Sequence, residues 1–153
     1  MATITSSDSQ PQENCAQAIL LGDERMHDPL LLFHLIQKGI PAWRAARALT
    51  ALGVTSNEQI VAKIVGMPSI KLRRAARDPK KVLSSHQSTC VWYFLAVFAL
   101  AERVIGPHQI AQRWITAPSL GLNGYAPIDL LINPFGYEIV CDFLARLEYG
   151  VYS

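Results

Sequence analysis

The 153-residue chain has little charge for its length. Only 17% of its residues are Asp, Glu, Lys or Arg, while 50% are hydrophobic; an average protein is about 25% charged. A disordered chain needs low hydrophobicity and high net charge, so this composition excludes one. The mean hydropathy of +0.18 indicates more apolar surface than one small globule can hide. We therefore expect an oligomer or an obligate partner.

Cysteine is scarce, and long hydrophobic runs are absent. Cys15, Cys90 and Cys141 are odd in number and form no CxxC pair, which excludes a disulfide framework and a zinc knuckle. The longest apolar run covers only residues 90–101, whereas a membrane helix needs about 20 residues, so we expect a buried helix there. The first fourteen residues lack the basic and apolar regions of a secretory signal, and we expect a cytoplasmic protein.

Catalytic and cofactor motifs are also missing. The sequence contains no GxxxxGK[ST], GxGxxG, HExxH or GxSxG, and its histidines and cysteines match no metal-site spacing, so no metal or cofactor is expected. His86 and Cys90 could form a base and a nucleophile, and Glu138 and Asp142 a carboxylate pair. Cys90 borders an apolar run, which favours a buried structural thiol, and most such carboxylate pairs are solvated. We therefore expect no enzymatic activity.

The charge that is present is unevenly distributed. The net charge is −4 over residues 1–35, +8 over residues 36–86 and −2 over residues 87–153. A basic segment next to acidic ones implies that the two parts have different partners. The basic segment is the candidate for nucleic-acid binding.

Helix start and stop signals follow one another along the chain, and no pair of strands is indicated. Capping residues, prolines and glycines predict helices over residues 29–38, 41–52, 55–65, 70–76, 85–105, 107–114, 127–131 and 134–149. The predicted fold class is therefore all-α.

Two capping boxes and two hydrophobic patterns add detail. Thr55 with Glu58, and Ser84 with Gln87, have the spacing of a capping box. The helix over residues 85–105 is apolar on every side in its middle, so it must be covered all round by its own domain or by a second subunit. In the last helix, the sequence predicts one apolar face that consists of Phe135, Ile139, Val140, Phe143, Leu144 and Leu147.

Residues 55–77 have the pattern of a helix-turn-helix. A short helix is followed by the tight turn Gly66-Met67-Pro68, Ser69 as the expected cap, and a second, basic helix. Burial of Ile70 leaves the basic side chains available to a DNA groove or its phosphates. The alternative, which the pattern alone does not exclude, is a solvated basic helix in an ordinary helical bundle. The residues expected to bind DNA are Ser69, Lys71, Arg73, Arg74, Arg77, Lys80 and Lys81.

The sequence Asp78-Pro79-Lys80-Lys81 ends the second helix of this pattern and marks the best domain boundary. We predict an N-terminal helix-turn-helix bundle over residues 28–82 and a small helical domain over residues 83–153. Residues 1–27 are predicted to be a disordered or partly ordered tail.

A distinctive pattern fills the C-terminal third. Its parts are Trp114, a loop with proline and glycine, the motif Pro127-x-x-Leu130-Leu131, a capped helix with an early Gly136, and the ending Tyr149-Gly150-Val151-Tyr152-Ser153. This pattern resembles the toxin-binding domain of the Xre/MbcA/ParS antitoxin family. Residues 69–74 resemble the start of the recognition helix in that family's N-terminal domain. The resemblance covers residues 36–153.

The resemblance implies an antitoxin that neutralises a RES-domain toxin, one of a family that acts on NAD, and represses its own operon as a DNA-binding homodimer. The C-terminal segment would cover the toxin's active site, where a tyrosine and a carboxylate suit a pocket for an aromatic, anionic nucleotide. Without the resemblance, a frayed tail would be expected there. An alternative function is a free-standing helix-turn-helix regulator whose second domain dimerises or senses a ligand. The residues expected to bind the toxin are Trp114, Asn123, Gly124, Tyr149, Gly150, Val151, Tyr152 and Ser153.

Overall fold

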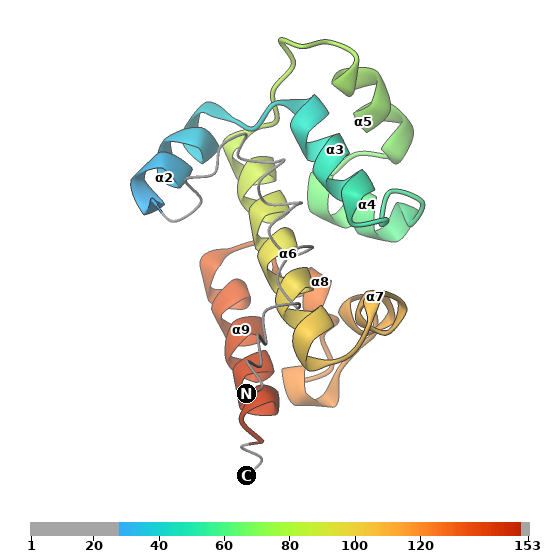
Figure 1. The fold of residues 1–153 in the computed structure, drawn as a ribbon, viewed down its shortest axis with the longest axis vertical. Coiled ribbons are helices and arrows are strands. Elements are labelled where there is room, and N and C mark those ends of the chain that lie inside the picture. The colour runs from blue at the N-terminus through green and yellow to red at the C-terminus, as the bar shows by residue number, and fades with distance from the viewer. Residues whose placement is uncertain (1–27, 151–153) are drawn as a thin grey trace, which may run out of the picture.

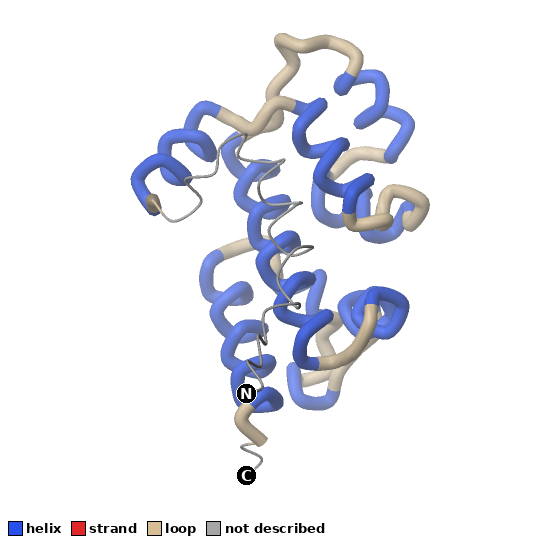
Figure 2. Tube along the Cα trace, viewed as in Figure 1, coloured by secondary structure: helices blue, strands red, loops and turns tan. Residues whose placement is uncertain are grey.

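The computed structural model describes residues 28–150, which form helices joined by short loops (Figure 1). The predicted tail over residues 1–27 lies outside the described residues. Within residues 28–150 there is no strand, only an isolated bridge between Pro41 and Val82 (Figure 2). The all-α class is therefore confirmed. The elements are α2 (Pro29–Lys38), α3 (Ala42–Ala51), α4 (Glu58–Val65), α5 (Ser69–Ala76), α6 (Ser85–Val104), α7 (His108–Thr116), η1 (Leu120–Leu122), α8 (Pro127–Leu130) and α9 (Pro134–Glu148).

The long helix α6 is the central element. Helices α2, α4, α7 and α9 all pack against it, and in Figure 1 it runs down the middle with α3, α4 and α5 beside its first half. Phe94 and Phe98 are fully buried, with ring centroids 5.4 Å apart. Trp92 and Tyr93 on the same helix stay partly exposed, so the expected cover on every side is confirmed only for part of the helix surface.

The first turn of α6 holds several other segments in place. The predicted capping box is present, because Ser84 Oγ accepts from the Gln87 N–H and Gln87 Oε1 accepts from the Ser84 N–H, both at 3.0 Å. Gln87 Nε2 also donates to the Val65 carbonyl at 2.7 Å, which satisfies the end of α4. The buried Ser88 hydroxyl accepts from the Ile40 N–H at 2.8 Å. The start of α6 thus fixes both α4 and the connection between α2 and α3.

That connection needs a glycine at its first residue. Gly39 has a φ of +93°, and a Cβ at this position would overlap the carbonyl oxygen of Leu83. The close approach lets the Leu83 N–H donate to the Ile40 carbonyl at 2.8 Å, and the Ala42 N–H donate to the Lys81 carbonyl at 2.9 Å. The chain after α5 therefore runs directly beside the chain after α2.

The start of α4 differs from the predicted capping box. Asn57, not Thr55, is the N-cap, and its side chain accepts from the Ile60 N–H at 3.3 Å. Asn at this position is as good a cap as Ser or Thr. Glu58, predicted to complete the box, instead points to α5.

The start of α5 also differs from the prediction. Pro68 is the N-cap, and Ser69 is the first helical residue rather than the cap. On this helix Leu72 is buried, whereas Ile70, which was expected to face the core, is 56% exposed. The two residues are about 200° apart around a helix, so only one of them can face α3 and α4.

The last helix buries a face shifted from the predicted one. Gly136, Val140 and Leu144 are buried, as part of the same face as Phe143 and Leu147. Phe135 and Ile139, which were expected on this face, are 77% and 51% exposed. The shift follows from Gly136, where a Cβ would overlap the Leu130 carbonyl. Its missing side chain lets α9 approach the backbone of α8 on that side.

Helices α6 and α9 run side by side in the same direction (Figure 1). Near the start of α9, Tyr93 and Tyr137 stack with ring centroids 4.3 Å apart. At the other end, Arg103 makes two contacts with the Glu148 carboxylate, at 3.1 and 3.2 Å. The position and direction of α9 are therefore fixed at both ends.

Helix α7 continues to Thr116, two residues beyond its predicted end. The loop after it contains η1, and the helix predicted over residues 127–131 is present as the single turn α8. The buried apolar residues of the described chain form one cluster, and Lys63 Nζ on α4 lies 2.7 Å from Asp129 Oδ1 on α8. The domain boundary at residues 82 and 83 stays a prediction. Among residues 28–150, no helix is both long and apolar enough to cross a membrane.

Candidate functional sites

The first candidate site is a basic surface formed by α5 and the loop that follows it. Helix α5 packs against α3 and α4, with Leu72 facing inward. The basic side chains predicted to bind DNA all lie on the outside. The exposed residues are Lys71, Arg73, Arg74, Arg77, Lys80 and Lys81. The loop keeps its shape through an Asx turn, in which Asp78 Oδ1 accepts from the Lys80 N–H at 2.9 Å.

Ser69, the remaining residue of the predicted DNA-binding set, is only 7% exposed. Its N–H donates to Glu58 Oε2 at 3.3 Å, and its hydroxyl donates to Glu58 Oε1. These two bonds lower the pKa of the Glu58 carboxyl, and the positive charge of Arg73 lowers that pKa further. Ser69 and Glu58 therefore hold α5 against α4 at the turn, and the Ser69 hydroxyl faces Glu58 rather than the surface.

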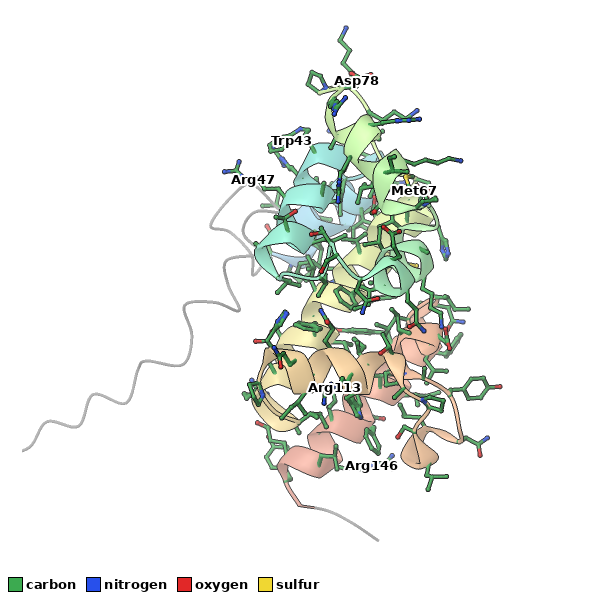
Figure 3. All side chains as sticks on the ribbon, turned by 90° about the vertical axis from the view of Figure 1, so that its right-hand side faces the viewer. Trp43, Arg47, Met67, Asp78, Arg113 and Arg146 are labelled. Atoms are coloured by element: carbon green, nitrogen blue, oxygen red, sulfur yellow. The ribbon has the colours of Figure 1, made fainter. Side chains whose placement is uncertain are left out.

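Helix α3 carries further aromatic and basic side chains at the same end of the molecule as α5. It packs directly against α5. Trp43 and Arg47 lie on the same end of the molecule as Asp78 (Figure 3), and the Arg44 guanidinium lies 5.3 Å from the centroid of the Trp43 ring. In Figure 3, Trp43 and Arg47 lie on the side of α3 away from Met67, so the packing of α3 on α5 does not place them among the cations of α5.

The second candidate site includes the loop between α7 and α8. Trp114 is half-buried and stacks on Phe143 of α9, with ring centroids 6.1 Å apart. Gly121 lies against the same Phe143 ring, where a Cβ would not fit. Of the predicted toxin-binding residues, Trp114 therefore ties α7 to α9 as part of the packing.

Asn123 and Gly124 form the exposed tip of this loop. Asn123 has a φ of +58°, as a left-handed residue that ends η1. The Gly124 N–H donates to the Ser119 carbonyl at 2.8 Å, and the Ser119 N–H donates to the Tyr125 carbonyl at 3.1 Å. The tip is thus a closed turn that presents its two predicted residues to solvent.

The end of α9 is the other part of the second site. Tyr149 is 77% exposed, and Gly150 follows it with a φ of +66°. Val151, Tyr152 and Ser153 lie outside the described residues. The structure brings Trp114 together with the core of α9, whereas Tyr149 and Gly150 stand at the point where the chain leaves that helix.

His86 and Cys90 were considered as a base and a nucleophile. The His86 Nε2 and Cys90 Sγ atoms are 3.7 Å apart. Cys90 is buried, and burial raises the pKa of its thiol. A nucleophilic cysteine needs a lowered pKa and an accessible sulfur, so this environment disfavours catalysis. Among residues 28–150, no group of three or more His, Cys, Asp or Glu side chains could hold a metal ion.

Comparison with known proteins gives the context for both sites. Residues 100–150 match the family described as the antitoxin Xre/MbcA/ParS C-terminal toxin-binding domain. A curated relative, the Antitoxin Xre of Yersinia enterocolitica serotype O:8 / biotype 1B (strain NCTC 13174 / 8081), is 32% identical over 95 residues. The matched segment covers 61% of this chain and 63% of that protein, which is less than two thirds of the relative's length. The match spans α7, α8 and α9, so this segment is similar to the toxin-binding domain of Xre/MbcA/ParS-type antitoxins.

Proposed function

We propose that this protein is the non-enzymatic antitoxin of a toxin–antitoxin pair, neutralising a RES-domain toxin in the cytoplasm and repressing its own operon by binding DNA. The observation that carries the proposal is the match of residues 100–150 to a toxin-binding domain. The segment after α9 would enter the toxin's active site and exclude its substrate.

The geometry of α9 supports a role for its last residues. The Arg103–Glu148 pair anchors the final turn on α6, and Tyr149 projects into solvent directly after it. A segment that begins at an anchored helix end loses less freedom on binding than one on a long linker. Residues 151–153 would therefore be delivered to the toxin from a defined point.

The basic surface formed by α5 and the loop that follows it supports the DNA-binding part of the proposal. Its six exposed cations on α5 and the following loop suit the phosphates of a duplex, because phosphate contacts supply most of the affinity of such proteins. The Glu58–Ser69 bonds position α5 as a fixed second helix. The domain over residues 28–82 is proposed as the DNA-binding half on this basis.

Helix α2 supports a homodimer. None of its residues is buried, and Leu30, Leu31 and Phe33 are exposed. Between α2 and α6 lies an open groove of about 530 Å³, lined by side chains without charge. These residues are Pro29, Leu32, Phe33, Ile36, Gln37, Ser85, Thr89, Trp92 and Tyr93. A helix-turn-helix protein commonly binds two half-sites as a dimer, and an uncharged apolar face can self-associate without charge repulsion.

The test is deletion of Val151–Ser153 in cells that also express the toxin encoded by the adjacent gene. We expect the truncated protein to lose protection, because the substrate pocket of the toxin stays open. A control variant, Ile110→Ala, changes an exposed apolar side chain on α7, in the matched segment but outside the α7–α8 loop and the end of α9, and should protect like the natural protein. Both variants should keep the natural melting temperature and DNA affinity.

Full protection by the truncated protein would contradict the proposed mechanism. The alternative is a free-standing transcription regulator, favoured by the basic surface alone. It predicts that no RES-domain protein is encoded next to this gene or co-purifies with its product.

A further inference from the structure

Helix α9 presents a row of exposed side chains on the side opposite its buried face. We call this row the outward stripe. At about 100° per residue its members fall within a sector of about 100°, and Val140 and Leu144 lie on the other side of the helix. The stripe consists of Phe135, Glu138, Ile139, Asp142, Arg146 and Tyr149, all of which are exposed.

The apolar content of the stripe is unusual for a solvent-facing side. Phe135, Ile139 and Tyr149 keep 77%, 51% and 77% of their surface accessible. Single exposed apolar residues are ordinary, but three in one row of one helix point to a partner. The packing of α9 within the molecule does not explain these exposed residues, because α9 contacts α6, α8 and η1 through its opposite face.

The charged members of the stripe indicate the chemistry of that partner. The stripe carries two acids, Glu138 and Asp142, and one base, Arg146, so its acids outnumber its base. The carboxylates that form ion pairs within residues 28–150 are those of Asp129, Glu148 and Glu102, so Glu138 and Asp142 have no ion pair in the described part of the chain. An apolar surface with two acids along it is complementary to an apolar groove bordered by Lys or Arg.

The position of the stripe indicates which partner it fits. The stripe lies entirely within residues 100–150, the segment that matches a toxin-binding domain. It ends at Tyr149, next to the residues proposed to enter the toxin. The uncharged groove beside α2 lies outside the matched segment and is better suited to a second copy, because two copies joined through α9 would bring acidic stripes together.

We propose that the outward stripe is the docking surface for the toxin, and that it fits an apolar groove bordered by basic residues beside the toxin's active site. This inference rests on the proposed function. In this proposal the stripe provides most of the affinity for the toxin, and residues 151–153 block the toxin's active site.

The test measures the affinity of the full-length chain for the purified toxin encoded by the adjacent gene. The double variant Phe135→Ala/Ile139→Ala should raise the Kd at least about tenfold, since aromatic anchors contribute strongly to such interfaces. Ile110→Ala, a truncation of an exposed apolar side chain on α7 in the same segment but outside both the stripe and the α7–α8 loop, should leave the Kd unchanged. Glu138→Lys/Asp142→Lys should also weaken binding, with the largest effect at low salt.

Each outcome has a defined meaning. An unchanged Kd for both double variants, with protection still lost on deletion of residues 151–153, overturns the inference and leaves the proposed function intact. Loss of the homodimer in either stripe variant, measured by light scattering, assigns the stripe to self-association and also overturns it. Failure of the natural protein to bind the toxin contradicts the proposed function itself. All substitutions are at exposed positions, and thermal melting confirms that the variants are folded.

Discussion

Glu58 and Ser69 show how a single side-chain pair fixes the turn between α4 and α5. The Glu58 carboxylate accepts both the N–H and the hydroxyl of Ser69, and these bonds lower the pKa of Glu58. An acid whose pKa is lowered in the folded state stabilises the protein above its unfolded pKa of about 4.3 and loses that effect as the pH falls through the folded pKa. The stability of this turn should therefore depend on pH in the acid range.

We predict that Glu58→Gln lowers the melting temperature at pH 7 and that the difference from the natural protein shrinks between pH 5 and pH 3. The amide keeps an acceptor but not the charge, so only the titrating part of the interaction is removed. In a Ser69→Ala background the same substitution should have a smaller effect with a weaker pH dependence, because the hydroxyl bond is lost while the backbone N–H bond and the charge of Arg73 remain. Circular dichroism melts at several pH values measure both. A difference that stays constant down to pH 3 would show that the charge of Glu58 does not stabilise the turn.

The local pattern could not have predicted this pair. The sequence places Thr55 and Glu58 at capping-box spacing, but Asn57 lies closer to the helix and serves as the cap. The actual partner of Glu58 is eleven residues later, a distance that no capping motif covers. By contrast, Ser84 and Gln87 were predicted correctly because both bonds of that box are within one turn.

At the scale of elements, the sequence predicted which segments form helices better than it predicted which face of each helix is buried. Capping residues and glycines are local, and they gave α2 and α6 nearly as the structure has them. The apolar face of α9 was predicted from its apolar side chains, and such a pattern does not indicate that Gly136 packs against the backbone of α8. For α5, the buried Leu72 and exposed Ile70 depend on how α3 packs against it. The hydrophobic periodicity therefore did not determine which face of each helix is buried, and the contacts with neighbouring helices did.

For α5 as an element, we predict that Lys71→Ala/Arg73→Ala/Arg74→Ala weakens binding to the duplex immediately upstream of the protein's own coding region. Each lost phosphate contact should also reduce the slope of log affinity against log salt by about 0.9. Fluorescence anisotropy over a series of salt concentrations measures both quantities.

The matched control for charge is Lys63→Ala/Arg113→Ala/Arg146→Ala, which removes three cations outside α5. Arg113 and Arg146 lie in the other half of the molecule (Figure 3). If both triple variants lose the same affinity, the effect comes from net charge and α5 is not the DNA-contacting helix. If neither loses affinity, the DNA-binding assignment is wrong.

For the whole molecule, the composition predicted an excess of apolar surface but not its location. In the structure, much of this exposed apolar surface lies on two helices. Helix α2 lies near one end of α6, and α9 lies along the other half of α6 (Figure 1). The basic charge of residues 36–86 lies on different elements, mainly α3, α5 and the loop after α5. Separate surfaces for self-association, toxin and DNA are therefore compatible with a chain of this size.

The α2 surface leads to a prediction on oligomeric state. We expect Phe33→Asp to convert the protein from a dimer to a monomer of 16.9 kDa, because a carboxylate buried in an uncharged groove without a partner is strongly unfavourable. Light scattering coupled to size exclusion measures the mass directly. Leu120→Asp is the control, because it adds the same charge at an apolar side chain that is exposed outside α2.

Loss of the dimer should also weaken DNA binding, because the α5 helices of the two protomers would no longer be held at the spacing of two half-sites. Toxin binding through α9 should be retained by the monomer. A natural protein that is already monomeric at micromolar concentration, or a Phe33→Asp variant that stays dimeric, would contradict the assignment of α2. If Phe33→Asp abolished toxin binding while the protein remained folded and dimeric, α2 and not α9 would be the face that the toxin covers.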